Sequence, residues 1–385
     1  MTGKFLRGVS GAALLALSVT AAAADPLAVP ANSGPLKVNP DPYSIDLDVP
    51  GLGWLIGKTY VSGVASAMVM GQTAANQNPG DKDFVADMTN GQVILQKTDG
   101  WFQWYVQAGA YSLPTLAVPY ARASVATPAT YDTVPVAYVK LVLDDSLNIQ
   151  AGKLFTLVGY ELAFSFQNMN VTRGMLWNQE PVVSRGVQVN YATGPLSISV
   201  SLTDAFYFNR PSWITGLVAY SFNGGSDILS FVGGGNLSQE SYASAQQNGS
   251  IFNLIYTHIS GNWTISPYVQ FANVPTNNFI GITKGATEIG GALLASYHFN
   301  DNWSLAGRFE YMGTAGTPSS ANLFLGPSSD AVSFTITPTW QWKRLFIRPE
   351  LSYVSASNVT PGMGMGPSGT DKDQFRGLVE FGVLL

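Results

Sequence analysis

Apolar and polar residues alternate one by one through most of this chain. Between residues 331 and 342 one parity holds Val332, Phe334 and Ile336, while serine, threonine and glutamine fill much of the other. The ranges 196–203 and 303–311 alternate in the same way. Successive side chains of a strand point to opposite faces, so each range predicts a strand with one apolar and one polar face.

About sixteen segments of this kind follow one another from residue 57 onward. Tight turns rich in Gly, Asn and Asp join them in pairs, and longer stretches rich in Gly, Pro, Ser and Thr separate the pairs. Short turns on one side and long loops on the other are typical of bacterial outer-membrane barrels. The expected strands are 57–70, 91–97, 100–111, 134–144, 147–158, 184–193, 196–206, 213–223, 226–236, 250–260, 262–272, 286–299, 302–312, 331–342, 344–355 and 374–385.

After the N-terminal leader, the sequence offers no apolar run of the roughly 18 residues that a membrane-spanning helix needs. A closed barrel is the other structure that satisfies every backbone polar group in lipid. We therefore predict an all-β transmembrane antiparallel β-barrel of about sixteen strands, with short periplasmic turns and long extracellular loops. An even strand number would place both chain ends in the periplasm.

Aromatic residues are expected to form belts at the two membrane interfaces. Eight steps separate Trp303, beside a tight turn, from Tyr311, beside a long loop. In strands tilted by about 40° these steps span about 20 Å, close to the apolar band of about 25 Å. The expected turn-side belt is Trp101, Phe102, Trp263, Trp303, Trp340 and Trp342. The expected loop-side belt is Tyr111, Phe206, Tyr207, Tyr311 and Tyr353.

The amino-acid composition excludes several kinds of active site. Only 11% of the residues are charged, against roughly a quarter in soluble domains. The chain has no cysteine and two histidines, His258 and His298, so thiol catalysis and cysteine-bound zinc are excluded, and a multi-histidine metal site is not expected. The sequence contains no G-x-S-x-G or H-E-x-x-H motif. We expect no enzyme activity, no cofactor and no metal.

The N-terminal region predicts export. Lys4 and Arg7 precede an apolar stretch at 12–19, and alanines at 22–24 fit a cleavage site, so residues 1–24 are interpreted as a signal peptide. Residues 25–56 are rich in proline and predict an extended periplasmic lead-in to a barrel at 57–385. Without the signal, 17 basic residues would face 24 acidic ones, a net charge of −7, which does not favour nucleic-acid binding.

Several strand fragments resemble one known family. They are Leu147–Glu161, Thr172–Gly174, Ser184–Tyr191, Arg348–Tyr353 and Phe375–Leu385. These fragments are similar to the putative beta-barrel porin-2, or OmpL-like, family, and the resemblance covers most of the mature chain. It implies a Gram-negative outer-membrane porin that forms a passive, water-filled diffusion channel for small hydrophilic solutes or ions.

The resemblance also implies partners. The last strand, ending at Leu385, looks like the signal that the barrel-assembly machinery reads, and outer-membrane lipids would surround the barrel. Three alternatives stay open: a non-conducting barrel with a structural or adhesive role, a barrel enzyme at the rim, and a soluble β-sandwich.

Charged residues on the polar parity of the strands are candidates for the pore lining. A ring of such charges would set the field and the selectivity of a pore. Hydration of any wet interior, or neutralisation between neighbouring strands, would explain the same pattern. The candidates are Lys140, Arg308, Glu310, Arg348, Glu350, Arg376 and Glu380.

The third long loop, about 159–183, is unusually apolar for a solvated segment. It carries Glu161, Arg173 and Glu180 among several aromatic and methionine residues. Sixteen-stranded porins fold their third external loop into the barrel, and this loop holds the same place in order. We expect it to narrow the pore. The alternative is that it caps the rim or meets a neighbouring subunit of a homotrimer.

Overall fold

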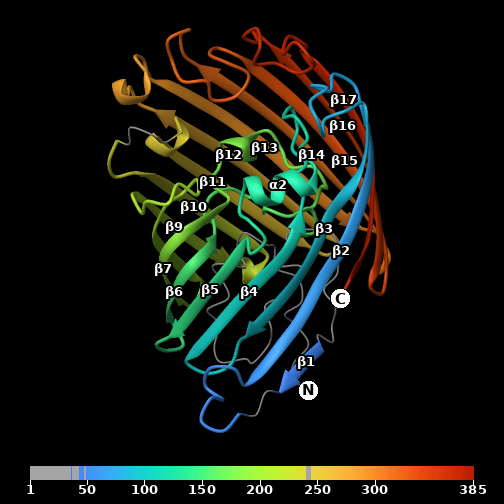
Figure 1. The fold of residues 1–385 in the computed structure, drawn as a ribbon. Helices are drawn as coiled ribbons and strands as arrows, with labels where there is room; N and C mark the ends of the chain where they lie inside the picture. Colours follow the sequence, from blue (N-terminus) through green and yellow to red (C-terminus); the bar gives the residue numbers. More distant parts are fainter. Residues whose placement is uncertain (1–35, 37–42, 47–48, 240–243) are drawn as a thin grey trace.

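A computed structural model describes residue 36 and residues 43–46, 49–239 and 244–385 (Figure 1). The predicted signal peptide at 1–24 and much of the predicted lead-in lie outside these residues. The principal strands of the described part are β2 (Lys58–Gln72), β3 (Phe84–Lys97), β4 (Phe102–Tyr111), β5 (Val136–Val142), β6 (Leu147–Phe155), β7 (Val183–Thr193), β8 (Leu196–Thr203), β9 (Trp213–Phe222), β10 (Asp227–Asn236), β11 (Ser250–Ser260), β12 (Trp263–Val274), β13 (Ala286–His298), β14 (Trp303–Ala315), β15 (Asp330–Trp342), β16 (Leu345–Ser357) and β17 (Asp373–Leu384).

These sixteen strands close into a barrel. Each pairs antiparallel with the next strand in the sequence, and β17 pairs with β2, which places Glu380 opposite Met68. A short additional strand, β1 (Tyr43–Asp46), pairs with the first residues of β2. The prediction of an antiparallel barrel of about sixteen strands is therefore confirmed.

The two faces of the strands point as the alternation predicts. On β15 the side chains of Val332 and Phe334 are 40% and 53% exposed on the outside of the barrel. Ser333, Thr335 and Thr337 are buried on the inside. The apolar parity therefore forms the outer surface, and the polar parity faces the interior.

The largest error in a predicted strand boundary lies at the start of β3. Strand β3 begins at Phe84, seven residues before the expected start at 91. The register between β2 and β3 shifts at Ser66/Ala67, where Thr89 has no opposite residue in the pairing. Such a bulge reverses the parity that faces outward, so Phe84 and Met88 alternate out of phase with Val93 and the pattern looked interrupted.

Short turns gather at one end of the barrel and long loops at the other (Figure 1). One long loop holds a helix, α2 (Ala123–Ala129), that packs against β3 and β4 and that the sequence pattern did not predict. Across the described residues, no helix is long and apolar enough to cross a membrane. The shorter 3-10 turns are η1 (Ser165–Gln167), η2 (Leu176–Gln179), η3 (Asn223–Gly225), η4 (Gln246–Asn248) and η5 (Asn278–Ile280).

The expected aromatic belts are present with two exceptions. Trp263 and Trp303 are exposed at the turn end, and Tyr353 is exposed at the loop end. Tyr111 is instead fully buried, because it has the inward parity of β4 and its backbone N–H donates to Thr127 of α2. Phe206 is also turned inward, with its ring edge on Trp213.

Candidate functional site: the barrel interior

The connection between β6 and β7, residues 156–182, runs through the inside of the barrel, and we call it the inner loop. From Val158 to Val182 its residues are buried, with Asn178 half-buried. The Phe164 ring packs edge-on against Tyr111 of β4, with ring centres 5.1 Å apart. The polar contacts of the inner loop reach strands β14 to β17 and also β11 and β12, where Asn253 accepts the Gly159 N–H and Gln270 donates to the Leu176 carbonyl. The apolar side chains of this loop are therefore buried by the interior of the barrel.

An irregular segment in the interior needs partners for its backbone N–H and C=O groups. Arg348 of β16 supplies several of them. Its guanidinium donates to the carbonyl of Ser165 at 2.9 Å, and to those of Asn168 and Met169 at 2.8 and 2.9 Å. It also lies 3.3 Å from the Glu380 carboxylate of β17. The planar donor array of arginine suits such a set of converging oxygens.

Glu350, two residues further along β16, accepts hydrogen bonds from the same loop. Its carboxylate accepts the backbone N–H of Val171 at 2.6 Å and that of Thr172 at 2.9 Å. The hydroxyl of Thr337 on β15 donates to it at 2.7 Å. Hydrogen bonds to a charged acceptor are stronger than neutral ones, so Glu350 and Arg348 fix adjacent stretches of the inner loop.

A third contact joins the inner loop to β14. Arg308 lies 2.5 Å from the Glu161 carboxylate of the loop and 3.2 Å from Glu310 on its own strand. The same guanidinium donates to the Thr172 carbonyl at 2.7 Å. Glu161 also accepts the Gly174 N–H at 2.7 Å. Glu161, Arg308 and Glu310 thus form one buried charged group.

Arg376 of β17 binds a different interior segment. It donates to the carbonyl of Thr115, in the connection that carries α2, at 2.9 Å, and to the Gln72 side chain at 3.0 Å. Thr115 in turn forms a backbone bridge with Arg173 of the inner loop. The connection that carries α2 and the inner loop are therefore tied to each other as well as to the wall.

Two predicted site residues of the inner loop, Arg173 and Glu180, have buried polar atoms without a hydrogen-bond partner. Arg173 donates to the Val171 carbonyl at 3.2 Å and stacks over the Trp177 ring, while its Nε and Nη2 have no hydrogen-bond partner. Both carboxylate oxygens of Glu180 are buried without a partner. Burial raises the pKa of Glu180 well above its ordinary value, and the nearby carboxylate of Glu161 raises it further. Glu180 therefore gives up its proton less readily than an exposed glutamate.

Two further charged residues, Lys140 and Glu288, have inward positions on their strands. Lys140, which the sequence predicted, lies half-buried on the inward parity of β5 with Val136 and Tyr138. Sequence reasoning missed Glu288 of β13, which is fully buried and accepts from Gln270 at 3.3 Å. The signal was available, because Glu288 shares the inward parity of its strand. No cluster of three or more His, Cys, Asp or Glu among the described residues could hold a metal ion.

The inward face changes character around the barrel. The inward positions of β14, β16 and β17 carry the arginines and glutamates that bind the interior segments, and β13 carries the buried Glu288. With β15 these strands form what we call the charged wall. The inward positions of β6 to β12 hold Ser, Thr, Asn, Gln and apolar residues, with no Asp, Glu, Lys or Arg among them. We call these seven strands the uncharged wall.

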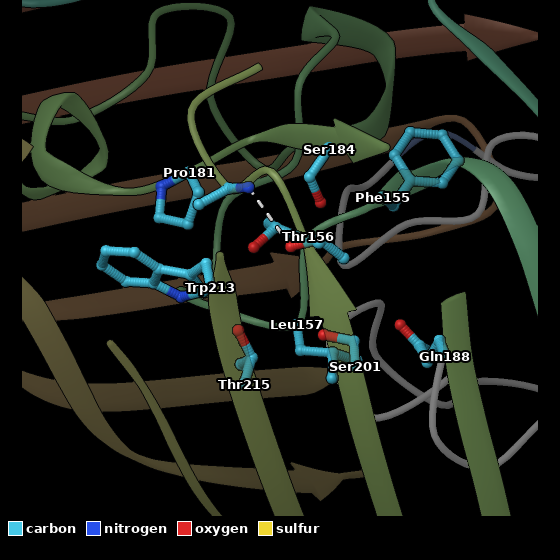
Figure 2. Close-up of a pocket in the computed structure, with 11 residues that line it drawn as sticks. Phe155, Thr156, Leu157, Pro181, Ser184, Gln188, Ser201, Trp213 and Thr215 are labelled. Carbon is cyan, nitrogen blue, oxygen red and sulfur yellow. Dashed lines mark hydrogen bonds between the residues drawn. The ribbon is translucent and has the colours of Figure 1, made fainter. Parts of the chain in front are cut away.

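A polar pocket lies where the two ends of the inner loop meet the uncharged wall (Figure 2). Thr156 and Pro181 come from the loop ends, Ser201 from β8, and Trp213 with Thr215 from β9. None of the residues that line the pocket is charged. The indole N–H of Trp213 has no hydrogen-bond partner although it is buried.

The family model described as "Putative beta-barrel porin-2, OmpL-like" matches residues 58–385, which is the whole of the barrel. The chain belongs to this family. It is accordingly an outer-membrane porin, a barrel that forms a diffusion channel.

Solved structures of low sequence identity share the fold of this porin. An anion-selective porin from Comamonas acidovorans superposes with a TM-score of 0.59 at 11% identity, covering 85% of this chain and 99% of that chain. The outer membrane channel DcaP of Acinetobacter baumannii gives 0.56 at 11% identity, covering 85% and 97%. No curated protein matches the sequence significantly.

Proposed function

We propose that the inner loop is the constriction of this porin, and that Glu161, Arg173 and Glu180 lie at its narrow part. The observation that carries the proposal is the double clamp on the loop backbone, in which Arg348 binds three carbonyls and Glu350 binds two N–H groups. A segment held in this way reduces the cross-section open to solutes. A loop that only capped the rim would have no need of partners on β16.

The charged wall would then act on the pore mainly through the inner loop. Arg308, Glu310, Arg348, Glu350 and Glu380 are all engaged with loop atoms or with each other. Lys140 and Arg376 remain candidates for direct contact with ions near the loop edges. Their contribution to selectivity is measurable as a change in reversal potential across a salt gradient after Lys140→Gln or Arg376→Gln.

The test of the constriction is single-channel current in planar bilayers. Deleting residues 165–178 removes the clamped part of the loop and should raise the conductance severalfold. Unchanged conductance in a correctly folded barrel would contradict the proposal. A wild-type barrel that gives no stepwise current would favour the alternative of a non-conducting, structural or adhesive barrel.

We further propose that residues 1–24 are removed on export and that the last strand engages the barrel-assembly machinery. The apolar alternation of β17, which ends beside Leu385, supports the second point. Mass spectrometry of protein from outer membranes would detect a mature chain that starts at Asp25. Loss of membrane assembly after Phe381→Asp would test the assembly signal.

A homotrimer in outer-membrane lipid is the assembly that we propose for the porin. The support is the fold that the chain shares with a solved porin and a solved outer membrane channel. Cross-linking of native membranes should give a trimer band, and a monomer at every cross-linker concentration would contradict it.

We also propose that the barrel has no catalytic role. His258 lies outside the lumen and contacts Asp227 at 2.6 Å, and loss of a hydrolytic activity in His258→Ala would contradict this.

A further inference from the structure

The segment just before β2, residues 49–57, lies at the short-turn end of the barrel (Figure 1). Its sequence, VPGLGWLIG, has no charged residue and no hydrogen-bonding side chain other than the Trp54 indole. Turns in water ordinarily carry Asn, Asp or Ser among their glycines and prolines, so this composition is unusual for a solvated segment. We call residues 49–57 the foot.

The foot packs against the outer face of β4 and the turn before it. The Trp104 indole N–H donates to the Leu55 carbonyl at 2.7 Å, and Trp104 has the outward parity of β4, opposite to the buried Tyr105. The Trp54 ring stacks on Trp101, with ring centres 5.7 Å apart and 9° between the ring planes. Trp101 belongs to the turn-side aromatic belt, so the foot lies on the lipid side of the wall at the level of this belt.

The backbone of the foot finds several of its partners within the protein. The Leu52 N–H donates to the Val49 carbonyl at 2.9 Å, and the N–H groups of Leu55 and Ile56 both donate to the Leu52 carbonyl, at 2.9 and 3.0 Å. The Thr59 hydroxyl donates to the Ile56 carbonyl at 2.8 Å. Backbone groups paired in this way do not depend on water, which a position in the membrane interface requires.

The apolar side chains of the foot are exposed where the outer surface of the barrel is also apolar. Val49 and Leu52 are each 41% exposed and Trp54 is 48% exposed, beside Trp101 at 58%. Exposed apolar side chains in one continuous patch indicate an interaction surface. The patch continues the aromatic belt, which already meets the membrane, so the partner that it fits is lipid.

Strand β1 extends the same outer face on the other edge of β2. Leu385 exchanges both backbone hydrogen bonds with Gly63, at 2.8 and 3.2 Å, and Tyr43 lies opposite Val61, two residues earlier in β2. Strand β1 thus continues the line of β17 along the edge of β2. Its Tyr43 and Ile45 share the parity of Val61, which faces outward, and both are exposed.

We propose that the foot is an interfacial anchor that inserts into the periplasmic leaflet of the outer membrane. Val49, Leu52 and Trp54 contact phospholipid at the boundary between headgroups and acyl chains. An indole with apolar neighbours favours this depth, because the ring is apolar and its N–H can reach the headgroup layer. The anchor holds the start of β2 at the membrane surface, and it is independent of the constriction.

The experiment uses the absence of cysteine from the chain. Leu52→Cys carries a single environment-sensitive fluorophore in the complete porin, reconstituted in vesicles of dioleoyl phosphatidylcholine or of its brominated form. Emission from position 52 should fall about twofold in the brominated lipid, because interfacial segments bury their apolar residues about 5–10 Å deep. Phe334→Cys on the outer face is the positive control, and Asp145→Cys in the turn between β5 and β6 is the negative control.

Iodide added to the water distinguishes the other outcomes. A label at position 52 that iodide quenches and brominated lipid does not would place the foot in the periplasm and overturn the proposal. A label that neither quencher reaches would mean that protein covers the foot, such as a second copy of the chain, and would also overturn it. Val49→Cys repeats the measurement where Leu52→Cys fails to fold, and folding is checked by the heat-dependent gel mobility typical of intact barrels.

A matched pair of substitutions tests the part that Trp54 plays. In the labelled Leu52→Cys porin, Trp54→Asp places a charge at the interface and should abolish the quenching by brominated lipid. Trp54→Phe keeps an apolar ring on Trp101 and should leave the quenching as it was. Equal quenching in the two variants would contradict the insertion of Trp54 into the leaflet.

Discussion

The two walls of this barrel use their inward polar groups in opposite ways. On the charged wall, Arg348 and Glu350 bind the backbone of the inner loop, and Arg308 pairs with Glu161. On the uncharged wall, Ser201 and Thr215 face the pocket beside the loop. Buried charges need fixed partners, whereas hydroxyls tolerate exchange. The charged wall therefore holds the inner loop through buried ions, whereas the uncharged wall contacts it through neutral side chains such as Asn253 and Gln270.

The largest loss of stability is expected from a substitution of Arg348. Arg348→Ala removes the donor of three loop carbonyls and the charged partner of Glu380, which keeps only hydroxyl donors. Loss of one partner of a buried ion pair costs about 3–5 kcal/mol. We expect the free energy of unfolding to fall by this amount in urea titrations of the barrel in lipid vesicles, followed by tryptophan fluorescence. The channel should also show larger current fluctuations.

The matched control lies on the other wall. Ser201→Ala removes a hydroxyl that holds no part of the inner loop, and its effect on unfolding should stay within about 0.5 kcal/mol. Equal losses in Arg348→Ala and Ser201→Ala would remove the distinction between the two walls.

Glu350→Gln is expected to lower the free energy of unfolding less than Arg348→Ala does, although it changes contacts with the same loop. The amide keeps the size of the side chain but replaces a charged acceptor of two backbone N–H groups with a neutral one. Since hydrogen bonds to charged groups contribute about 1.5–3 kcal/mol each, a loss of about 2 kcal/mol in the same titration is expected. A variant as stable as the wild type would show that the carboxylate charge is not needed to hold Val171 and Thr172.

The smallest effect is expected at Glu180, which has a buried carboxyl and no partner. A carboxyl whose pKa is raised by folding costs no stability when both states are protonated, and destabilises the folded state as pH rises above its unfolded pKa. Glu180→Gln should therefore match the wild type at acidic pH and exceed its melting temperature by about 2 °C at neutral pH. A lower melting temperature at neutral pH would mean that Glu180 has a stabilising partner.

Strand number and facing could be predicted from the sequence because alternation is local. The parity of Phe334 and Thr335 follows from strand geometry alone, and it also placed Arg308, Arg348 and Glu380 on the inside. The same reasoning failed for the first half of β3, where a bulge lies opposite Ser66. One extra residue reverses which parity faces outward, and the amino-acid composition gives no sign of it. The buried position of Tyr111 was missed because its partners, α2 and Phe164, come from other parts of the chain.

The amino-acid sequence by itself determined the barrel, since each strand carries the facing of its side chains in its own alternation of polar and apolar residues. Only the tertiary structure decided which residues of the barrel interior hold the inner loop. That choice depends on contacts between residues far apart in the chain, such as Ser165 with Arg348 and Glu161 with Arg308, and no local pattern encodes such pairings. The different roles of the charged and the uncharged wall follow from these long-range contacts with the inner loop.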